Sequence, residues 1–331
     1  MRCAVSYAFL RAARWSRDKM PFDSPFSPRP RVLDLDGSLL RQSDFLRCSR
    51  AQVVSLASAG AGLRYLCRRD RRQNFERRLA AKSSPADRHR LTFYGSGDFH
   101  HLSFSLLKRF SRPLSVIVFD QHPDWDATSP FPCCGTWVGE ALRLPHVQRV
   151  IVLGAGSEDL GGAQLWRGHR AALACGRLEI FPATLGRSLW PVLRPQTLAS
   201  GQRSGAWMKW NTLERVGWEA ALAGVIARLP TSDIYISVDK DCLREREAIS
   251  NWDAGELALP DVCVAIERLR RERNLVGADV TGEWSGGAPA NAFFRAVSRA
   301  DHPPRFAPDR AELERNEVTN LALWKAFGGH E

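Results

Sequence analysis

The segment VIVFDQHPDWD, residues 116–126, joins an apolar run to four side chains that can bind a metal ion. Asp120, His122, Asp124 and Asp126 stand at alternate positions. Such groups are costly to bury unless they are paired or bound to a cation. A straight strand would spread residues 120 to 124 over about 13 Å, which is too long for one ion. The segment suits two ions held roughly 3.5–4 Å apart if it curls off the strand end.

Three further apolar runs also end in carboxylates or imidazoles. The groups concerned are Asp98, His100 and His101 after residues 91–95, Asp239 and Asp241 after 233–238, and Asp279 and Glu283 after 275–278. Carboxylate oxygens mixed with imidazoles, without a thiolate, favour Mn²⁺ or a similar ion over a structural zinc. The sequence therefore predicts a centre with two divalent metal ions, Mn²⁺ being preferred.

Short apolar runs that alternate with helical patterns must position these groups. The expected strands are 31–36, 91–95, 114–120, 149–154, 178–183, 233–239 and 275–282, and the expected helices are 101–110, 211–229, 260–272 and 311–327. This alternation predicts an α/β fold with a mostly parallel sheet between two helical layers. In such sheets ligands bind at the carboxyl ends of the strands. Residues 184–210 show no clear period, and we expect a long loop near the sheet edge.

Four motifs resemble those of the ureohydrolase family, which includes arginase, agmatinase and formimidoylglutamase. FDQHPDWD is similar to its D-A-H-x-D segment, SVDKDCL to its S-x-D-x-D-x-x-D segment, GSGDFHHLSFSLL to its G-G-D-H-S-x-x segment, and GADVTGE to its late D-x-x-E segment. The motifs occur in the family's order, across about residues 90–290. The resemblance implies a divergent arginase-like protein with a three-layer αβα fold and a mostly parallel central sheet.

The resemblance also implies roles for individual residues. The metal ligands would be His100, Asp120, His122, Asp124, Asp239 and Asp241, with His101 as the alternative to His100. Two ions would bridge a water molecule, and the resulting hydroxide would attack the sp² carbon of a guanidino, amidino or related substrate. Asp124 would pass a proton to the leaving nitrogen. Glu283 would hold the cationic end of a small-molecule substrate.

The sequence departs from the family around the substrate. The family's His in a G-N-x-H-G context is replaced by PCCGTWVGE, and no His follows until His146. The G-T-G-T-P-like run after the second aspartate pair is also missing. We therefore expect an intact metal centre with a rebuilt substrate pocket. The candidates for its wall are Trp125, Asp126, Trp137, Trp252 and Asp253.

Other interpretations of these motifs are open. DLDGS, with Asp34 and Asp36, is close to the opening motif of haloacid dehalogenase-like phosphatases, although a strand followed by an Asp-Gly turn also explains it. A non-catalytic metal-binding arginase-like protein would explain the missing His. A single-metal deacetylase of the same superfold is a third alternative. Asp124 and Asp241 argue against it, because they would be surplus ligands for a single ion.

Composition limits the partners. The net charge is +11, and the densest basic segment, residues 67–82, has acids mixed in. It predicts a solvated helix face or a site for anionic partners, and we expect no nucleic-acid binding. No apolar run reaches the roughly 20 residues that span a bilayer, so we expect no membrane association. Self-association is left open.

Cysteine usage and the N-terminal composition complete the predictions. The eight cysteines form no C-x-x-C pair, which favours reduced thiols and a cytoplasmic protein. Residues 1–30 are Arg-rich and then rich in Pro and Ser, which predicts a disordered or extended segment, although residues 1–20 also resemble a transit peptide in composition. Residues 31–331 are expected to form one arginase-like domain.

Overall fold

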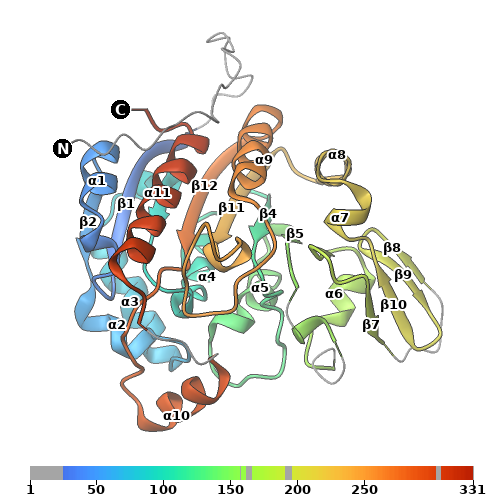
Figure 1. Ribbon diagram of the computed structural model, residues 1–331, viewed down its shortest axis with the longest axis horizontal. Coiled ribbons are helices and arrows are strands. Elements are labelled where there is room, and N and C mark those ends of the chain that lie inside the picture. Colours follow the sequence, from blue (N-terminus) through green and yellow to red (C-terminus); the bar gives the residue numbers. More distant parts are fainter. Residues whose placement is uncertain (1–24, 157, 162–165, 191–195, 303–306, 331) are drawn as a thin grey trace.

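Eight strands form one parallel sheet at the centre of the protein (Figure 1). The computed structural model describes residues 25–156, 158–161, 166–190, 196–302 and 307–330. The spatial order of the strands is β2 (Gln52–Ser55), β1 (Ser27–Asp34), β3 (Arg90–Phe93), β12 (Asn274–Thr281), β11 (Asp233–Asp239), β4 (Leu114–Phe119), β5 (Val147–Leu153) and β6 (Leu178–Phe181). Every pairing between neighbours is parallel. The predicted α/β class is therefore confirmed.

Helices cover both faces of the sheet, and each face has its own hydrophobic core. Along β4 the side chains alternate, with Val116 and Val118 in one core and Ile117 and Phe119 in the other. The first core is closed by α2 (Ala57–Leu63), α3 (Arg69–Ala81), α4 (Leu102–Leu107), α5 (Trp137–Ala141) and α6 (Arg170–Ala174). The second is closed by α1 (Ser43–Ser49), α7 (Leu213–Val216), α8 (Trp218–Arg228), α9 (Leu259–Glu272) and α11 (Arg310–Ala326). Burial on both faces explains why the strands read as continuous apolar runs.

The remaining helix, α10 (Ala292–Asp301), lies below the sheet in Figure 1. Its N-cap is Asn291, whose side-chain oxygen accepts a hydrogen bond from the backbone N–H of Phe294 at 3.1 Å. The helix follows the loop that leaves β12. This connection brings a helix from the C-terminal part of the chain to the edge of the sheet where the parallel strands end.

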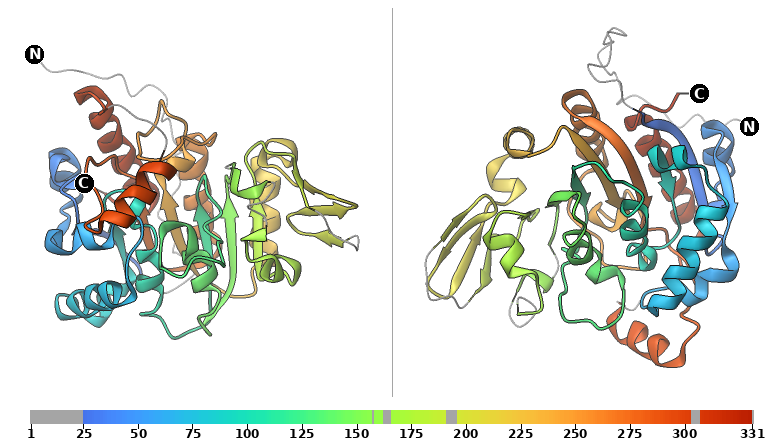
Figure 2. Two further views of the ribbon diagram at one scale, coloured as in Figure 1. Left: turned by 90° about the horizontal axis from the view of Figure 1, so that it is seen from below. Right: turned by 180° about the vertical axis from the view of Figure 1, so that it is seen from behind.

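The prediction of a long loop over residues 184–210 is wrong. This segment contains β7 (Arg187–Leu189), β8 (Gln196–Leu198), β9 (Gly201–Ser204) and β10 (Trp207–Trp210), which form an antiparallel sheet in the order β7-β10-β9-β8. Figure 2 shows this small sheet projecting beside the main body of the protein. Met208 and Trp210 anchor it in the first core. Its strands have three or four residues, too few for a clear alternation in the sequence.

Element boundaries differ from the predictions in three places. The helix expected over 211–229 is divided into α7 and α8 by Gly217, which has φ +84°. The edge strand β2 was not predicted, because only one of its four residues is buried. Strand β1 begins at Ser27, inside the segment expected to precede the domain. The rest of that segment, residues 1–24, lies outside the described residues.

Candidate metal centre

The carboxyl ends of β4 and β11 bring the predicted ligands together. Val238 pairs with Phe119 in the register of these two strands. The next residues, Asp239 and Asp120, therefore leave the sheet side by side. His100 reaches the same place from the short 3₁₀ turn Gly97–Phe99 that follows β3. Three segments distant in sequence thus meet at one edge of the sheet.

All six predicted ligands lie around one cavity, in two overlapping groups. In the first, Nδ1 of His100 lies 3.1 Å from Oδ2 of Asp120, 3.1 Å from Oδ2 of Asp124 and 3.4 Å from Oδ2 of Asp239. In the second, Nδ1 of His122 lies 3.0 Å from Oδ2 of Asp241 and 3.8 Å from Oδ1 of Asp120. Candidate ligand atoms of His100, Asp120 and Asp124 lie within 4.8 Å of one another, as do those of Asp120, His122 and Asp241. Asp120 belongs to both groups and joins them.

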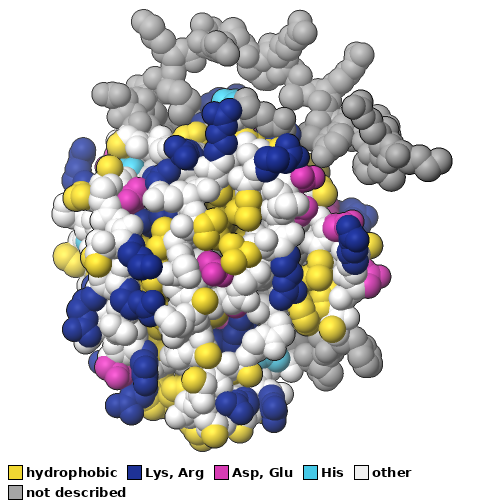
Figure 3. Space-filling view, turned by 90° about the vertical axis from the view of Figure 1, so that its left-hand side faces the viewer, with side chains coloured by type: hydrophobic (Ala, Val, Ile, Leu, Met, Phe, Trp, Pro, Cys, Tyr) yellow, Lys and Arg dark blue, Asp and Glu magenta, His cyan; other side chains and the backbone are white. Residues whose placement is uncertain are grey.

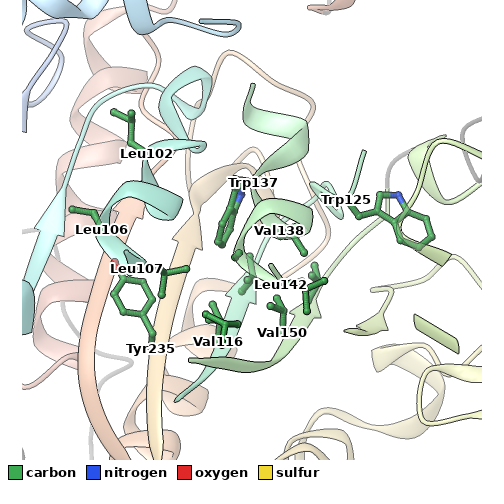
Figure 4. Packing of buried hydrophobic residues seen from close by; sticks show 14 of the residues in the cluster. Leu102, Leu106, Leu107, Val116, Trp125, Trp137, Val138, Leu142, Val150 and Tyr235 are labelled. Carbon is green, nitrogen blue, oxygen red and sulfur yellow. The ribbon is translucent and has the colours of Figure 1, made fainter. Parts of the chain in front are cut away.

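Trp137 aims the carboxylate of Asp124. The indole N–H of Trp137 donates a hydrogen bond of 2.6 Å to Oδ2 of Asp124. The backbone of Asp124 has φ +47°, which is strained for a residue other than glycine. Trp137 was expected to form the pocket wall, but it is fully buried in α5 and packs beside Val138 in the core (Figure 4). It is a support for Asp124 and does not line the cavity.

A buried polar cluster behind His100 fixes the orientation of its ring. Nε2 of His100 lies 2.9 Å from Oγ of Ser237, which donates a 2.7 Å hydrogen bond to Asp279. Asp279 also accepts hydrogen bonds from the hydroxyl groups of Tyr94 at 3.1 Å and Tyr235 at 2.6 Å. Groups that hold the far nitrogen of a histidine determine which nitrogen faces a metal ion. The strand-end carboxylate of Asp279 therefore supports the cluster from behind.

The charges of the six candidate ligands favour a bound cation. Burial raises the pKa of all four carboxyl groups, and neighbouring carboxylates raise it further at Asp120, Asp239 and Asp241. Burial lowers the pKa of His100 and His122, but the adjacent carboxylates outweigh it, and the pKa of both imidazoles lies well above the usual value.

The buried oxygens also fit bound cations. Oδ2 of Asp120 is close to His100 but makes no well-aligned hydrogen bond within the described residues. Cations would offset the repulsion between the carboxylates and take up this oxygen. A donor set of carboxylate oxygens plus two imidazoles can hold a divalent metal ion.

The cavity above the cluster has a volume of about 250 Å³. Of the predicted wall residues, Trp125, Asp126 and Trp252 line it, and Asp126 pairs with Arg167. Asp253 is exposed and is not among the lining residues. The other charged or aromatic lining residues could not be predicted, since they lie outside the motifs: Tyr65, Asp159, Arg167 and Asp301.

His101 is not part of the cluster. Its Nε2 lies 2.7 Å from the carbonyl oxygen of Leu63, on the side of α2. Burial lowers the pKa of His101 to about 3, so the ring is neutral. Of the two adjacent histidines, His100 is the one that faces the carboxylates.

The structure places Glu283, the residue expected to hold the substrate, away from the cavity. Glu283 is buried, pairs with Lys240 and accepts hydrogen bonds from the side chains of Gln42, Asn316 and Asn320 at 2.7–2.9 Å. It does not line the cavity. The signal missed was Lys240, a basic residue between Asp239 and Asp241 whose burial requires an acidic partner. Glu283 therefore joins β12 to α11.

The carboxylates of the DLDGS motif have structural partners. Asp34 accepts the backbone N–H of Gly37 at 2.9 Å, as an Asp-Gly turn predicts. Asp36 accepts hydrogen bonds from Arg64 at 3.0 Å and from Ser38 at 2.6 Å. Neither residue lines the cavity. This geometry contradicts a phosphatase centre built on Asp34 and Asp36.

No model of a known protein family matches the chain. An uncharacterized protein of Thermotoga maritima is 25% identical over 193 residues, which span 58% of this chain and 58% of that protein, less than two thirds of its length.

Solved structures show a closer likeness in fold. An arginase from Bacillus cereus matches with a TM-score of 0.56 and 15% identity over 91% of this chain and 98% of its own. Arginase from Entamoeba histolytica, in complex with L-ornithine, matches with a TM-score of 0.55 and 11% identity over 91% and 98%. Proclavaminate amidino hydrolase from Streptomyces clavuligerus matches with 0.50 and 12% identity over 96% and 100%. The chain therefore has an arginase-like fold, although its sequence is only 11–15% identical to the sequences of these structures.

Proposed function

We propose that this protein is a metal-dependent hydrolase of a linear C–N bond in a guanidino, amidino or related small molecule. The proposal rests on one observation above all. Two groups of buried ligands share Asp120 at the carboxyl edge of a parallel sheet, in a chain with the arginase fold. The six residues would hold two divalent ions, with Mn²⁺ preferred. Bound ions of this kind supply a Lewis acid that lowers the pKa of water and stabilises developing negative charge.

The protein's own residues have four tasks in this mechanism. Trp137 and the strained backbone of Asp124 hold one carboxylate in a fixed direction. Asp124 takes a proton from the attacking water and delivers it to the leaving nitrogen. Ser237 keeps Nδ1 of His100 turned toward the carboxylates. Trp125 and Trp252 line the cavity and limit the access of bulk water.

The charges around the cavity favour a cationic substrate. Beyond the ligand cluster, the cavity is lined by the carboxylates of Asp126, Asp159 and Asp301, against one basic residue, Arg167, which pairs with Asp126. A guanidinium or amidinium group also stacks well on aromatic rings such as Tyr65 and Trp252. The thiols of Cys133 and Cys134 stay protonated there, because burial raises the pKa of Cys133 to about 12 and raises the pKa of Cys134 well above its usual value.

Metal content per chain tests the proposal most directly. The protein loaded with Mn²⁺ and then dialysed should retain close to two equivalents, and Asp124→Asn should retain fewer. Asp253→Asn is the matched control, because Asp253 is an exposed acid outside the cavity. A panel of guanidino and amidino compounds is then scored for urea or ammonia release. Retention of no metal by the unsubstituted protein would refute the proposal.

A second function is favoured by two observations. The family's His is replaced, and Glu283 faces Lys240 instead of the cavity. A non-catalytic metal-binding protein would show the predicted metal content without hydrolysis of any compound in the panel.

No helix within the described residues is long and apolar enough to cross a membrane. We also propose a cytoplasmic location, because the described cysteines are free thiols.

A further inference from the structure

Helix α3 contains a cluster of arginines that the metal centre does not use. Arg71, Asn74 and Arg78 are spaced by three and four residues and so share one face of the helix. An adjacent face of the helix is buried, and its arginine, Arg72, makes two hydrogen bonds of 2.6 and 2.8 Å to Glu140. The helix thus pairs one arginine with a carboxylate in the interior and presents two others on the outer face.

That outer face forms one wall of a cavity larger than the one above the metal centre. Its volume is about 420 Å³, compared with about 250 Å³. The other walls come from α2 and from the start of α10, and together the lining residues are Ser58, Ala59, Ala61, Gly62, Leu63, Leu66, Arg68, Arg71, Asn74, Arg78, Ala290, Asn291 and Phe294. No described acidic residue is among them. Part of the lining is apolar, and the remainder offers hydroxyl, amide and guanidinium groups.

The two guanidinium groups on this face have no carboxylate partner within the described residues. Arg78 donates only to Oγ of Ser58, at 2.9 Å. The side chain of Arg71 runs past Gly62, where a Cβ atom would come within 3.9 Å of its Cδ. Some other surface arginines do pair with a carboxylate, as Arg310 does with Glu314 at 2.8 Å. Figure 3 views the side of the molecule that carries α1, β2, α2 and α3, where Lys and Arg side chains gather with few acids between them.

We propose that the cavity between α2, α3 and the start of α10 is a second binding site, which takes an organic phosphate. Guanidinium groups bind phosphate through paired hydrogen bonds, and unpaired ones do so without losing a protein contact. Arg71 and Arg78 lie seven residues apart, or roughly 10 Å along the helix axis, which leaves room between their backbone positions for a ligand larger than a phosphate ion. The apolar surface around Leu63 and Phe294 suits an organic body between or beside the anionic groups. This inference does not depend on the proposed hydrolase activity.

Calorimetric titration of the full, metal-loaded chain with ADP tests the proposal, with adenosine and inorganic phosphate as separate titrants. ADP should bind saturably and more tightly than either. The double variant Arg71→Ala/Arg78→Ala should weaken ADP binding at least about tenfold, since two charged hydrogen-bond donors are lost. The matched control, Arg69→Ala/Arg77→Ala, removes the same charge from exposed positions on the same helix outside the cavity and should change the affinity less than about twofold.

A variant that leaves the charge unchanged gives an independent measurement. Gly62→Leu fills the cavity from the α2 side and should also weaken ADP binding. Equal weakening by the two double arginine variants would show diffuse attraction to a basic surface and overturn the proposal. Absence of saturable binding would overturn it too, as would inorganic phosphate binding as tightly as ADP. Binding that survives in Arg71→Ala/Arg78→Ala but is lost in Asp239→Asn would assign ADP to the metal centre instead.

Discussion

Asp120 is the residue on which both halves of the ligand cluster depend. Its Oδ2 faces His100 and its Oδ1 faces His122. We predict that Asp120→Asn loses both metal equivalents, because its carboxylate belongs to both groups. His122→Asn should lose about one, because His122 belongs to the second group alone. Metal analysis after dialysis distinguishes the two variants, and one full equivalent left in Asp120→Asn would contradict the sharing.

The hydrogen bond from Trp137 to Asp124 gives a second test at this scale. Trp137→Phe keeps a large aromatic ring in the core but removes the N–H donor, which is worth about 1.5–3 kcal/mol to a charged acceptor. We expect kcat/KM to fall roughly tenfold to a hundredfold, with a smaller effect on the free energy of unfolding. Trp190→Phe is the control, because Trp190 is buried in the same core without contacting Asp124. Equal losses of kcat/KM in the two variants would mean that both effects come from core packing alone.

At the scale of elements, the sequence predicted the strands well and the irregular parts poorly. The seven predicted strands were found because strands buried on both faces leave continuous apolar runs, as at 114–120 and 233–239. The side-chain partners of Glu283 were not predictable in the same way. Its partners come from three separate segments, through Gln42, Lys240 and the α11 residues Asn316 and Asn320. Pairwise contacts of that kind leave no local pattern.

The grouping of the six candidate ligands was predictable because each follows a strand or the turn after one. Strand ends meet at one edge of a parallel sheet, so local patterns were enough to bring them together. The residues of the pocket wall were not predictable, because Tyr65 comes from a loop and Asp301 from α10. Trp137 and Asp253 were misplaced for the same reason, since proximity in sequence does not set the direction of a side chain.

Helix α10 is tied to the centre by an ion pair that depends on pH. Nε2 of His302, at the end of α10, lies 2.7 Å from Oδ1 of Asp98, and its ring packs against Trp252 at 4.2 Å between centroids. Burial lowers the pKa of His302, but Asp98 and Asp301 outweigh it, and the net effect is an increase. A raised pKa stabilises the fold fully below the unfolded value of about 6.5 and loses this effect as the pH rises through the folded value.

We therefore predict that His302→Gln lowers the free energy of unfolding more at pH 6 than at pH 9. Urea unfolding of both proteins at the two pH values gives the difference. His330→Gln is the control, because His330 is exposed near the C-terminus. A loss that is the same at both pH values would mean that the charge of His302 does not contribute. The expected total effect at pH 6 is about 1.5–3 kcal/mol, as for a hydrogen bond to a charged group.

For the whole molecule, the cluster of six candidate ligands destabilises the folded state, and bound cations would offset this destabilisation. Its carboxyl groups have a raised pKa, so the folded protein without metal binds more protons than the unfolded chain above pH 3.8. The raised pKa of His100 and His122 acts in the same direction. The stability of the metal-free protein should therefore fall as the pH rises, until these groups have lost their protons. Cations stabilise the folded state by about 2.7 kcal/mol when present at 100 times their dissociation constant.

Removal of metal should consequently lower the thermal midpoint, and more at pH 8 than at pH 5. About 3 kcal/mol corresponds to roughly 4 °C for a chain of this size. Differential scanning calorimetry of the Mn²⁺-loaded protein, with and without EDTA, measures the shift at each pH. The double variant Asp120→Asn/Asp239→Asn is the control: it removes two of the crowded carboxylates, so its midpoint should not respond to EDTA. A midpoint of the unsubstituted protein that ignores EDTA at both pH values would mean that the buried carboxylates are balanced by His100 and His122 alone, without any cation.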